Sequence, residues 1–370
     1  MKSMKMIRLT ETENYRVQGR TVASRDPLIL LWTGASLDLC VQGSELWVEL
    51  EGPYEQYENW VLFEINGEVL SRQMVDRQRR FVCVFRGREP ERITQVRIIK
   101  EVQAMSADPK HCLKIYGLRL DGQLLPVPEK KCRLEFVGDS ITSGEGAIGA
   151  VAEEEWISSF FGHERSYPYL VSKALDAEYR VISQSGWGVF ASWDNRRECV
   201  LPKHYEQICS LVPGEEFRNC GFYEKNDFAA WQPDVVCVNL GTNDDGAFGH
   251  PGSFDPLTGT LWKLRMVGEA YLEEDRLLVQ HAVKDFLGML RRNDPKALIL
   301  WCFGLAGDRL APTIQAAIAE YCRDTEDSRV AYVPLPETTQ ETMGARVHPG
   351  YAAHQAAAQI IAEIIKREIF

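Results

Sequence analysis

The chain has 370 residues, and its 53 acidic against 42 basic residues give a formal net charge of −11 at neutral pH. This length exceeds the usual size of one domain and predicts two. The acidic balance, with no concentrated basic run, argues against a nucleic-acid partner. No stretch approaches 18 uncharged apolar residues, so we expect neither a transmembrane helix nor a membrane partner.

The N-terminus and the cysteines bear on the location of the protein. Residues 1–8 carry charge, but no apolar core follows them, so no signal peptide is expected. The ten cysteines include no CxxC pair, and several, such as Cys83 and Cys237, lie inside apolar runs typical of a core. No Cys or His cluster has the spacing of metal ligands. We therefore predict a cytoplasmic protein in a reducing compartment, without a metal.

The first 130 residues contain short strand-like runs between turn signals, with little helical periodicity. Asn66-Gly67 is a strong signal for a two-residue hairpin, and Asp121-Gly122 is another. The even spacing and the alternation of apolar residues predict an antiparallel β-sandwich with the jelly-roll arrangement. The predicted strands are 28–32, 36–42, 45–50, 60–65, 80–85, 95–99 and 113–120.

The pattern changes after a proline-containing linker at 126–130. Strands then alternate with helices, which predicts a parallel sheet covered by helices. We therefore place a β-sandwich domain at 1–130 and an α/β domain at 131–370. The predicted strands of the second domain are 132–137, 181–183, 234–240 and 297–303, and its predicted helices are 167–175, 274–292, 311–323 and 350–368.

Four short blocks of the α/β domain supply the parts of a serine hydrolase. Gly138-Asp139-Ser140-Ile141, Ser185-Gly186-Trp187-Gly188 and Gly241-Thr242-Asn243-Asp244 each follow a predicted strand, and Val347-His348-Pro349 comes last. Because ligands bind outside the carboxyl ends of parallel strands, the first three blocks predict a cleft at one edge of the sheet. A nucleophile, a base and oxyanion donors are the groups that acyl transfer requires.

These blocks resemble those of the SGNH or GDSL hydrolase superfamily, which is named for a serine, a glycine, an asparagine and a histidine. The resemblance implies a flavodoxin-like domain in which Ser140 is the nucleophile and His348 the general base. It also implies an oxyanion hole formed by the backbone N–H groups of Ser140 and Gly186 and the side-chain amide of Asn243. No metal or organic cofactor is implied.

A β-sandwich placed before such a domain is similar to carbohydrate esterase family 2, whose members remove acetyl groups from plant polysaccharides. Residues 138–144, 180–189 and 231–236 match that family's extended blocks, except that Ser143 stands where cysteine is common. The resemblance implies an esterase that deacetylates an oligosaccharide through a Ser-His acyl-enzyme mechanism. Two rival functions stay open: a lipase- or thioesterase-type acylhydrolase, and a catalytically inactive carbohydrate-binding protein.

The acid that usually orients the histidine of this superfamily is missing. An aspartate commonly stands three or two residues before the histidine, and here those positions hold Ala345 and Arg346. A neutral imidazole still needs a partner for its Nδ1–H. We expect a backbone carbonyl of the preceding loop, 334–344, to be that partner, with Glu337 or Glu341 as the alternative. We also expect Arg346 to point away from the base or to be paired.

Candidate substrate contacts lie near the four blocks. Trp187 and Trp156 lie in or beside loops expected to shape the cleft, as does Trp193, and sugars stack well on aromatic faces. Asp139, beside the nucleophile, and His250, in the loop after the third block, complete the tentative set. Core packing is the plainer explanation for the tryptophans, and a structural role is the plainer one for the histidine. The sequence does not predict the sugar or the oligomeric state.

Overall fold

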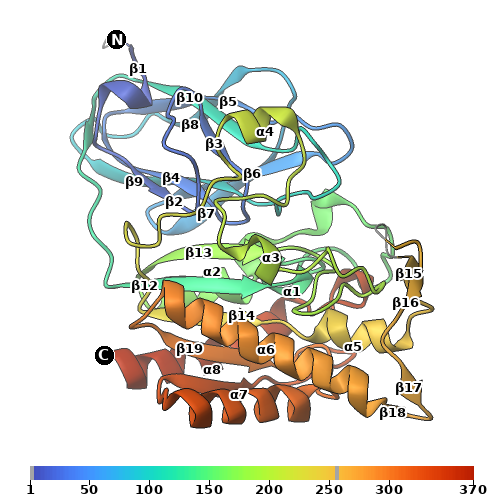
Figure 1. Ribbon diagram of the computed structural model, residues 1–370. Helices are drawn as coiled ribbons and strands as arrows, with labels where there is room; N and C mark the ends of the chain where they lie inside the picture. Colours follow the sequence, from blue (N-terminus) through green and yellow to red (C-terminus); the bar gives the residue numbers. More distant parts are fainter. Residues whose placement is uncertain (1–3, 255–257) are drawn as a thin grey trace. The chain divides into compact units, whose positions relative to one another are not determined.

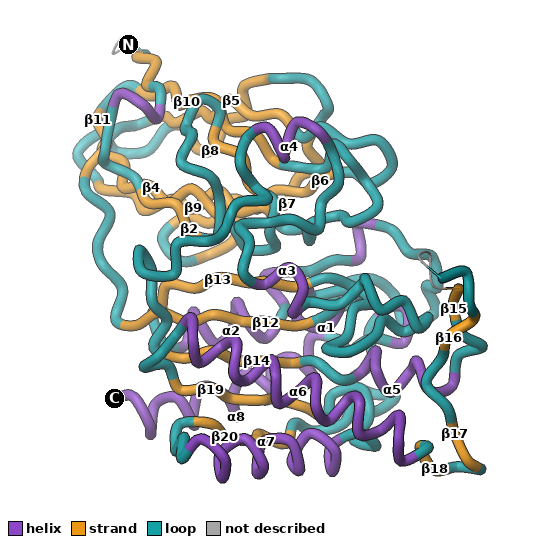
Figure 2. Tube along the Cα trace, viewed as in Figure 1, coloured by secondary structure: helices purple, strands orange, loops and turns teal. Residues whose placement is uncertain are grey.

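The computed structural model describes residues 4–254 and 258–370, whose contacts divide into two compact units. The first unit is the chain up to Lys130 together with Trp156–Glu164 and Gln207–Asn226, and the rest of the described chain forms the second. Strands dominate the first unit, whereas helices and strands alternate in the second (Figure 2). The two later segments differ from the predicted division at 130, because they fall in the α/β part of the sequence but pack with the sandwich.

The first unit contains two antiparallel sheets, as the sequence predicts. Along β5 (Glu45–Glu51) the buried residues Leu46, Val48 and Leu50 alternate with partly exposed ones, so one face of its sheet packs on the core. One sheet has the order β1 (Lys5–Ile7), β10 (Leu113–Leu120), β5, β8 (Arg80–Arg86), with β3 (Leu28–Leu30) also on β10. The other has the order β11 (Gln123–Leu125), β4 (Ser36–Gln42), β9 (Ile93–Lys100), β6 (Asn59–Ile65), β7 (Glu68–Val75), with β2 (Arg16–Gln18) on β4.

The two predicted hairpin turns have different outcomes. Asn66 and Gly67 join β6 to its partner β7, and both have positive φ, 52° and 84°, as a type I′ turn requires. Asp121 and Gly122 do not form a hairpin, so that prediction is wrong. The strands on either side, β10 and β11, belong to different sheets, and the turn carries the chain from one layer to the other.

The second unit is a parallel five-stranded sheet covered by helices (Figure 1). The helices α6 (Glu273–Asn293) and α7 (Ala311–Thr325) pack together, as do α2 (Tyr167–Ala174) and α8 (Tyr351–Ile369), and Figure 1 shows the two pairs on opposite faces. The strand order is β13 (Ala177–Ser183), β12 (Cys132–Gly138), β14 (Val235–Asn239), β19 (Leu298–Phe303), β20 (Val330–Pro334). This is the flavodoxin-like order, whose ligand crevice lies where the first and third strands meet.

Shorter elements connect these strands and helices. The site described below is built on three of them, α1 (Ser140–Ser143), α5 (Thr242–Gly249) and the 3-10 turn η4 (Ala345–Val347). The others are η1 (Leu9–Glu11), η2 (Ser158–Phe160), η3 (His163–Arg165), α3 (Pro202–Tyr205), α4 (Glu215–Asn219) and the small strands β15 (Ser253–Phe254), β16 (Leu261–Trp262), β17 (Met266–Val267) and β18 (Ala270–Tyr271). Within the described ranges, no helix is both long and apolar enough to span a bilayer.

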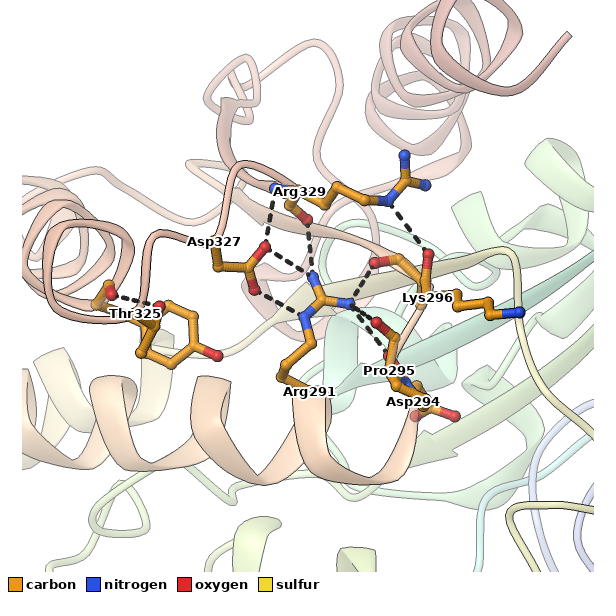
Figure 3. Close-up of polar contacts among 9 residues, drawn as sticks. Arg291, Asp294, Pro295, Lys296, Thr325, Asp327 and Arg329 are labelled. Atoms are coloured by element: carbon orange, nitrogen blue, oxygen red, sulfur yellow. Dashed lines mark hydrogen bonds and ion pairs between the residues drawn. The ribbon is translucent and has the colours of Figure 1, made fainter.

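One arginine joins the loops at the amino-terminal ends of the last two strands. Arg291, in the last turn of α6, donates from Nε to Asp327 Oδ2 at 2.7 Å and from Nη1 to the Ala297 carbonyl at 2.7 Å. Its remaining acceptors are Asp327 Oδ1 and the carbonyl oxygens of Asp294, Pro295 and Arg329 (Figure 3). Because β19 and β20 begin just after these loops, the guanidinium ties the end of α6 to the start of both strands.

Candidate active site

Ser140 is presented by the abrupt change from strand to helix at the end of β12. Asp139 is the N-cap of α1, and its carboxylate accepts a hydrogen bond from Ile141 N at 3.0 Å. The helix has a single turn, because Gly144 follows it in the left-handed conformation (φ 78°). Ser140 is therefore fixed at the carboxyl end of the strand next to the switch point, although only 7% of its surface is exposed.

His348 lies in hydrogen-bonding contact with Ser140. Its Nε2 is 2.9 Å from Ser140 Oγ, and its Nδ1 is 2.8 Å from the carbonyl oxygen of Arg346. A carbonyl can only accept, so Nδ1 carries the hydrogen in the neutral ring and Nε2 is free to accept from the serine hydroxyl. This is the protonation state that a general base requires.

The backbone before His348 has an unusual conformation. Arg346 and Val347 both have φ of 57°, although neither is glycine and valine is β-branched. The turn that these residues make directs the Arg346 carbonyl to the ring. We expected the carbonyl to come from the loop 334–344, and the structure supplies it two residues further along. Glu337 and Glu341 are exposed, and the described part of the chain shows no contact between either carboxylate and His348.

The three expected oxyanion donors lie at the ends of β12, β13 and β14. In the described residues, neither Ser140 N–H nor Gly186 N–H has an acceptor. Gly186 has φ of 79°, and a Cβ at this position would lie 2.9 Å from the Trp193 ring, so a side chain would be both strained and crowded. Asn243 Nδ2 is 3.1 Å from both Asp139 Oδ2 and the Trp187 carbonyl, so both amide hydrogens have acceptors inside the protein.

The region that holds these residues matches a known protein family. The model of the GDSL-like Lipase/Acylhydrolase family matches residues 136–356, which include Ser140, Gly186, Asn243 and His348. The chain belongs to this family.

Two solved structures of carbohydrate esterases are similar to this chain over nearly its whole length. A solved structure of an acetyl xylan esterase, Est2A from Butyrivibrio proteoclasticus, is 38% identical, with a TM-score of 0.96 over 99% of this chain and 98% of that one. A family two carbohydrate esterase from Clostridium thermocellum, solved with cellohexaose, shares the fold at 22% identity and a TM-score of 0.78 over 96% of this chain and 99% of that one. The predicted architecture, an antiparallel sandwich before a flavodoxin-like hydrolase domain, is confirmed.

A curated relative of this GDSL-like hydrolase is the cellulase/esterase CelE of Acetivibrio thermocellus. It is 24% identical over 344 residues, which are 91% of this chain but 37% of CelE. The chain thus spans little more than a third of that relative's length.

Two buried aspartates hold groups of the site in place through hydrogen bonds. Asp139 is fully buried and bonds Ile141 N and Asn243 Nδ2, so it positions other groups and is not the substrate contact that we expected. Burial raises the pKa of Asp139 to about 7, and the charges of Asp244 and Glu145 add to the effect. Asp244 is also fully buried, and its carboxylate accepts three backbone N–H groups from residues 189–191, which follow the Gly186 turn.

Glu145 is a residue of the hydrolase site that the sequence analysis missed. Its side chain is 3% exposed, and its Oε1 lies 3.8 Å from His348 Nε2 and 2.9 Å from Arg346 Nε. Ser185 Oγ donates to its other oxygen at 2.6 Å. A single glutamate in a turn after the nucleophile carries no motif, so only the packing of η4 against this turn reveals it. The expectation that Arg346 is paired agrees with these contacts.

The three candidate tryptophans differ in their packing and solvent exposure. Trp187 is 6% exposed and packs on His204 at 5.0 Å between ring centroids, which removes its face from solvent. Trp156 belongs to the first unit, where its ring packs edge-on against Tyr57 at 4.8 Å. Both are explained by packing. Trp193 is instead 51% exposed and lies against the Gly186 turn.

His250 supports the exposed tryptophan of the site. It follows the last residue of α5, and its ring meets Trp193 edge-on at 5.0 Å. Its Nδ1 accepts from Gly252 N at 3.3 Å, which fixes the ring orientation. Within the described ranges, no group of three or more Cys, His, Asp and Glu side chains is arranged to hold a metal ion.

Proposed function

We propose that this protein is a serine esterase that removes O-acetyl groups from a carbohydrate. The observation that carries the proposal is the pairing of Ser140 Oγ with His348 Nε2 at 2.9 Å, with Nδ1 held by a carbonyl. The similarity to an acetyl xylan esterase over nearly the whole chain supports an acetyl ester on a carbohydrate as the substrate. The ten unpaired cysteines favour a reducing compartment, which agrees with the predicted cytoplasmic location.

The chemistry runs in two acyl-transfer steps. Ser140 Oγ attacks the acetyl carbonyl while His348 Nε2 takes the hydroxyl proton, and the N–H groups of Ser140 and Gly186 face the oxyanion. Asn243 joins them if its amide exchanges the Trp187 carbonyl for the oxyanion. His348 then protonates the departing sugar oxygen, and a water activated by the same ring cleaves the acetyl-serine ester to acetate.

The exposed face of Trp193 is the best candidate platform for the sugar. It lies beside the Gly186 turn, where the acetyl carbonyl would bind, and the His250 ring packs edge-on against it at 5.0 Å. A planar aromatic face next to the oxyanion donors suits a pyranose ring that carries an acetyl ester. The partner that we infer is therefore an acetylated oligosaccharide.

The test is acetate release from acetylated xylo-, manno- and gluco-oligosaccharides, measured beside a chain-length series of p-nitrophenyl esters. We expect cleavage of at least one oligosaccharide and a steep loss of rate for acyl chains beyond propionyl. Ser140→Ala and His348→Ala should each lower kcat by about 10⁴-fold or more, and the double variant should be little worse, because the two residues act as one unit. Trp193→Ala should raise KM for the oligosaccharide and spare p-nitrophenyl acetate.

Two outcomes would overturn the proposal in favour of a rival function. Faster hydrolysis of long acyl esters than of acetate esters would indicate a lipase- or thioesterase-type acylhydrolase. Binding of oligosaccharides without hydrolysis of any acetyl ester, and with no effect of Ser140→Ala, would indicate a carbohydrate-binding protein.

A further inference from the structure

Without the usual aspartate, no carboxylate of the described residues is hydrogen-bonded to Nδ1 to stabilise the positive charge that His348 acquires during the reaction. When His348 takes the serine proton it becomes a cation, and the Arg346 carbonyl that holds Nδ1 carries only a partial charge. In a Ser-His-Asp triad the carboxylate both orients the ring and stabilises the imidazolium. The carbonyl performs the first task. The second requires a full negative charge close to the ring.

Glu145 is the carboxylate in position to supply that charge. Its Oε1 lies 3.8 Å from His348 Nε2, close enough for a strong effect in a buried setting. The turn that carries it packs tightly on η4. Gly146 O accepts from Ala345 N at 3.1 Å, and a Cβ on Gly146 would lie 2.7 Å from His348 Cβ. The backbone thus fixes how near the carboxylate stands to the ring.

Arg346 forms an ion pair with the Glu145 carboxylate before the reaction begins. Its Nε is 2.9 Å from the same Oε1 that faces the ring, and its Nη1 also donates to the Glu154 carbonyl. A buried carboxylate without a cation would draw a proton onto Nε2, and a charged histidine cannot accept from the serine. With Arg346 beside it, Glu145 has a permanent partner, so His348 can stay neutral until the reaction charges it.

We infer that Glu145 and Arg346 form a positioning pair that replaces the absent aspartate, with the Arg346 carbonyl orienting His348 and the Glu145 carboxylate stabilising its charged form. The inference rests on the proposed esterase function. Its two members act through His348 and touch no reacting atom. Their charges have opposite effects on the imidazolium. Removal of the Glu145 charge and removal of the Arg346 charge should therefore shift the pH dependence of activity in opposite directions.

Two further titratable groups interact electrostatically with Glu145 or His348. Asp139 caps the helix of Ser140, and His354 on α8 is fully buried, where burial lowers the pKa of His354 to about 3 and keeps that ring neutral. Because Glu145 also helps to raise the pKa of Asp139, a rate profile alone could mix the two groups. Titration of His348 itself, by NMR of protein carrying ¹³C-labelled histidine and assigned with His348→Gln, separates them.

The experiment compares kcat/KM against pH for acetyl-ester hydrolysis in wild type, Glu145→Gln, Arg346→Met and the double variant. The acid limb of this profile is the fall in kcat/KM at low pH. Its midpoint should shift to a pH about one unit lower in Glu145→Gln, which loses a negative charge beside His348, and about one unit higher in Arg346→Met, which loses a positive one. The double variant should return close to wild type, and Arg346→Lys should restore the limb that Arg346→Met displaces. The NMR titration of His348 should follow the same order.

Arg291→Met is the matched control, because it also breaks an arginine–carboxylate pair of the same domain but at the opposite ends of the strands (Figure 3). It should lower stability and leave the acid limb unchanged. Glu145→Gln preserves shape, so it decides the question if Arg346→Met does not fold.

The outcomes separate the two proposals. If both single variants leave the acid limb and the His348 titration in place, or move them in one direction, the positioning pair is wrong while the esterase function stands. If Ser140→Ala keeps full activity, both proposals are overturned.

Discussion

The two ends of the parallel sheet each carry an arginine paired with a carboxylate, and they use it differently. At the amino ends of the strands, Arg291 meets Asp327 at 2.7 Å, and its other donors bond carbonyls of the loops that it closes. At the carboxyl ends, Arg346 meets Glu145 at 2.9 Å, and the carboxylate also faces His348. An arginine–carboxylate pair contributes to stability where its neighbours keep their charge, and we infer that it serves catalysis where one neighbour, His348, changes charge.

The backbone differs between the two ends as well. Arg291 lies in regular α-helix, whereas Arg346 and Val347 have φ of 57°. Conformations of this kind cost about 1–3 kcal/mol each and persist where the surrounding contacts enforce them. Here the contacts are those of η4 with the turn that carries Glu145. At the amino ends Arg291 itself is unstrained, and the positive φ of Glu326 (56°) lies at the C-cap of α7, just before Asp327.

The two ends of the sheet should differ most at Asn243. Asn243→Ala should lower kcat by about 10²–10³-fold with little change in KM, as the loss of one oxyanion donor does. Asn293→Ala is the control at the other end, because Asn293 also donates from Nδ2, to Glu206 Oε1 and to Met289 O, and should leave kcat unchanged. Steady-state kinetics with an acetyl ester decide it. A loss of only a few-fold would mean that Asn243 stays bonded to Asp139 and Trp187 throughout and does not reach the oxyanion.

A smaller effect, on stability alone, is expected at Arg291. Arg291→Met should lower the free energy of unfolding by about 2–3 kcal/mol, because it leaves the half-buried Asp327 without its cation and several carbonyls without donors. Urea denaturation measures the loss, and kcat/KM should be unchanged in the folded enzyme. Lys284→Met removes the more exposed pair with Asp324, which joins the same helix α6 to α7, and it should have a much smaller effect. Equal losses in the two variants would contradict the role given to the Arg291 network.

The smallest effect, on stability, is expected at the strained turn before His348. Val347→Gly should raise the free energy of unfolding by about 1 kcal/mol, since relief of about 1–3 kcal/mol of strain exceeds the extra chain entropy of glycine. Val347 is 74% exposed, so little packing is lost. Val267→Gly is the control, because Val267 is 63% exposed but has ordinary strand geometry in β17, and there the substitution should destabilise. A destabilised Val347→Gly would show that the turn is not strained.

Much of the fold could be predicted because its signals are local. The four predicted helices begin and end within two residues of their predicted bounds, since each has a clear apolar face. The edge strand β20 was missed although Val330 to Val333 are apolar, because the run is short and Pro334 and Pro336 follow it, which favours a loop. The helix α5 was read as a loop, because its sequence holds two glycines and two aspartates and lacks helical periodicity.

For the candidate site, the main groups and their chain order could be predicted from the sequence, because Ser140, Gly186 and Asn243 follow strand ends and parallel strands bring their carboxyl ends together. The surroundings of these groups could not be predicted and follow from the packing of the chain. This packing replaced the missing acid by the carbonyl of Arg346, brought Glu145 to within 3.8 Å of His348, and buried Trp187 while leaving Trp193 exposed. The physical reason is that a strand end is encoded by its own residues, whereas the environment of a side chain is set by the segments that pack on it, and these are distant in sequence.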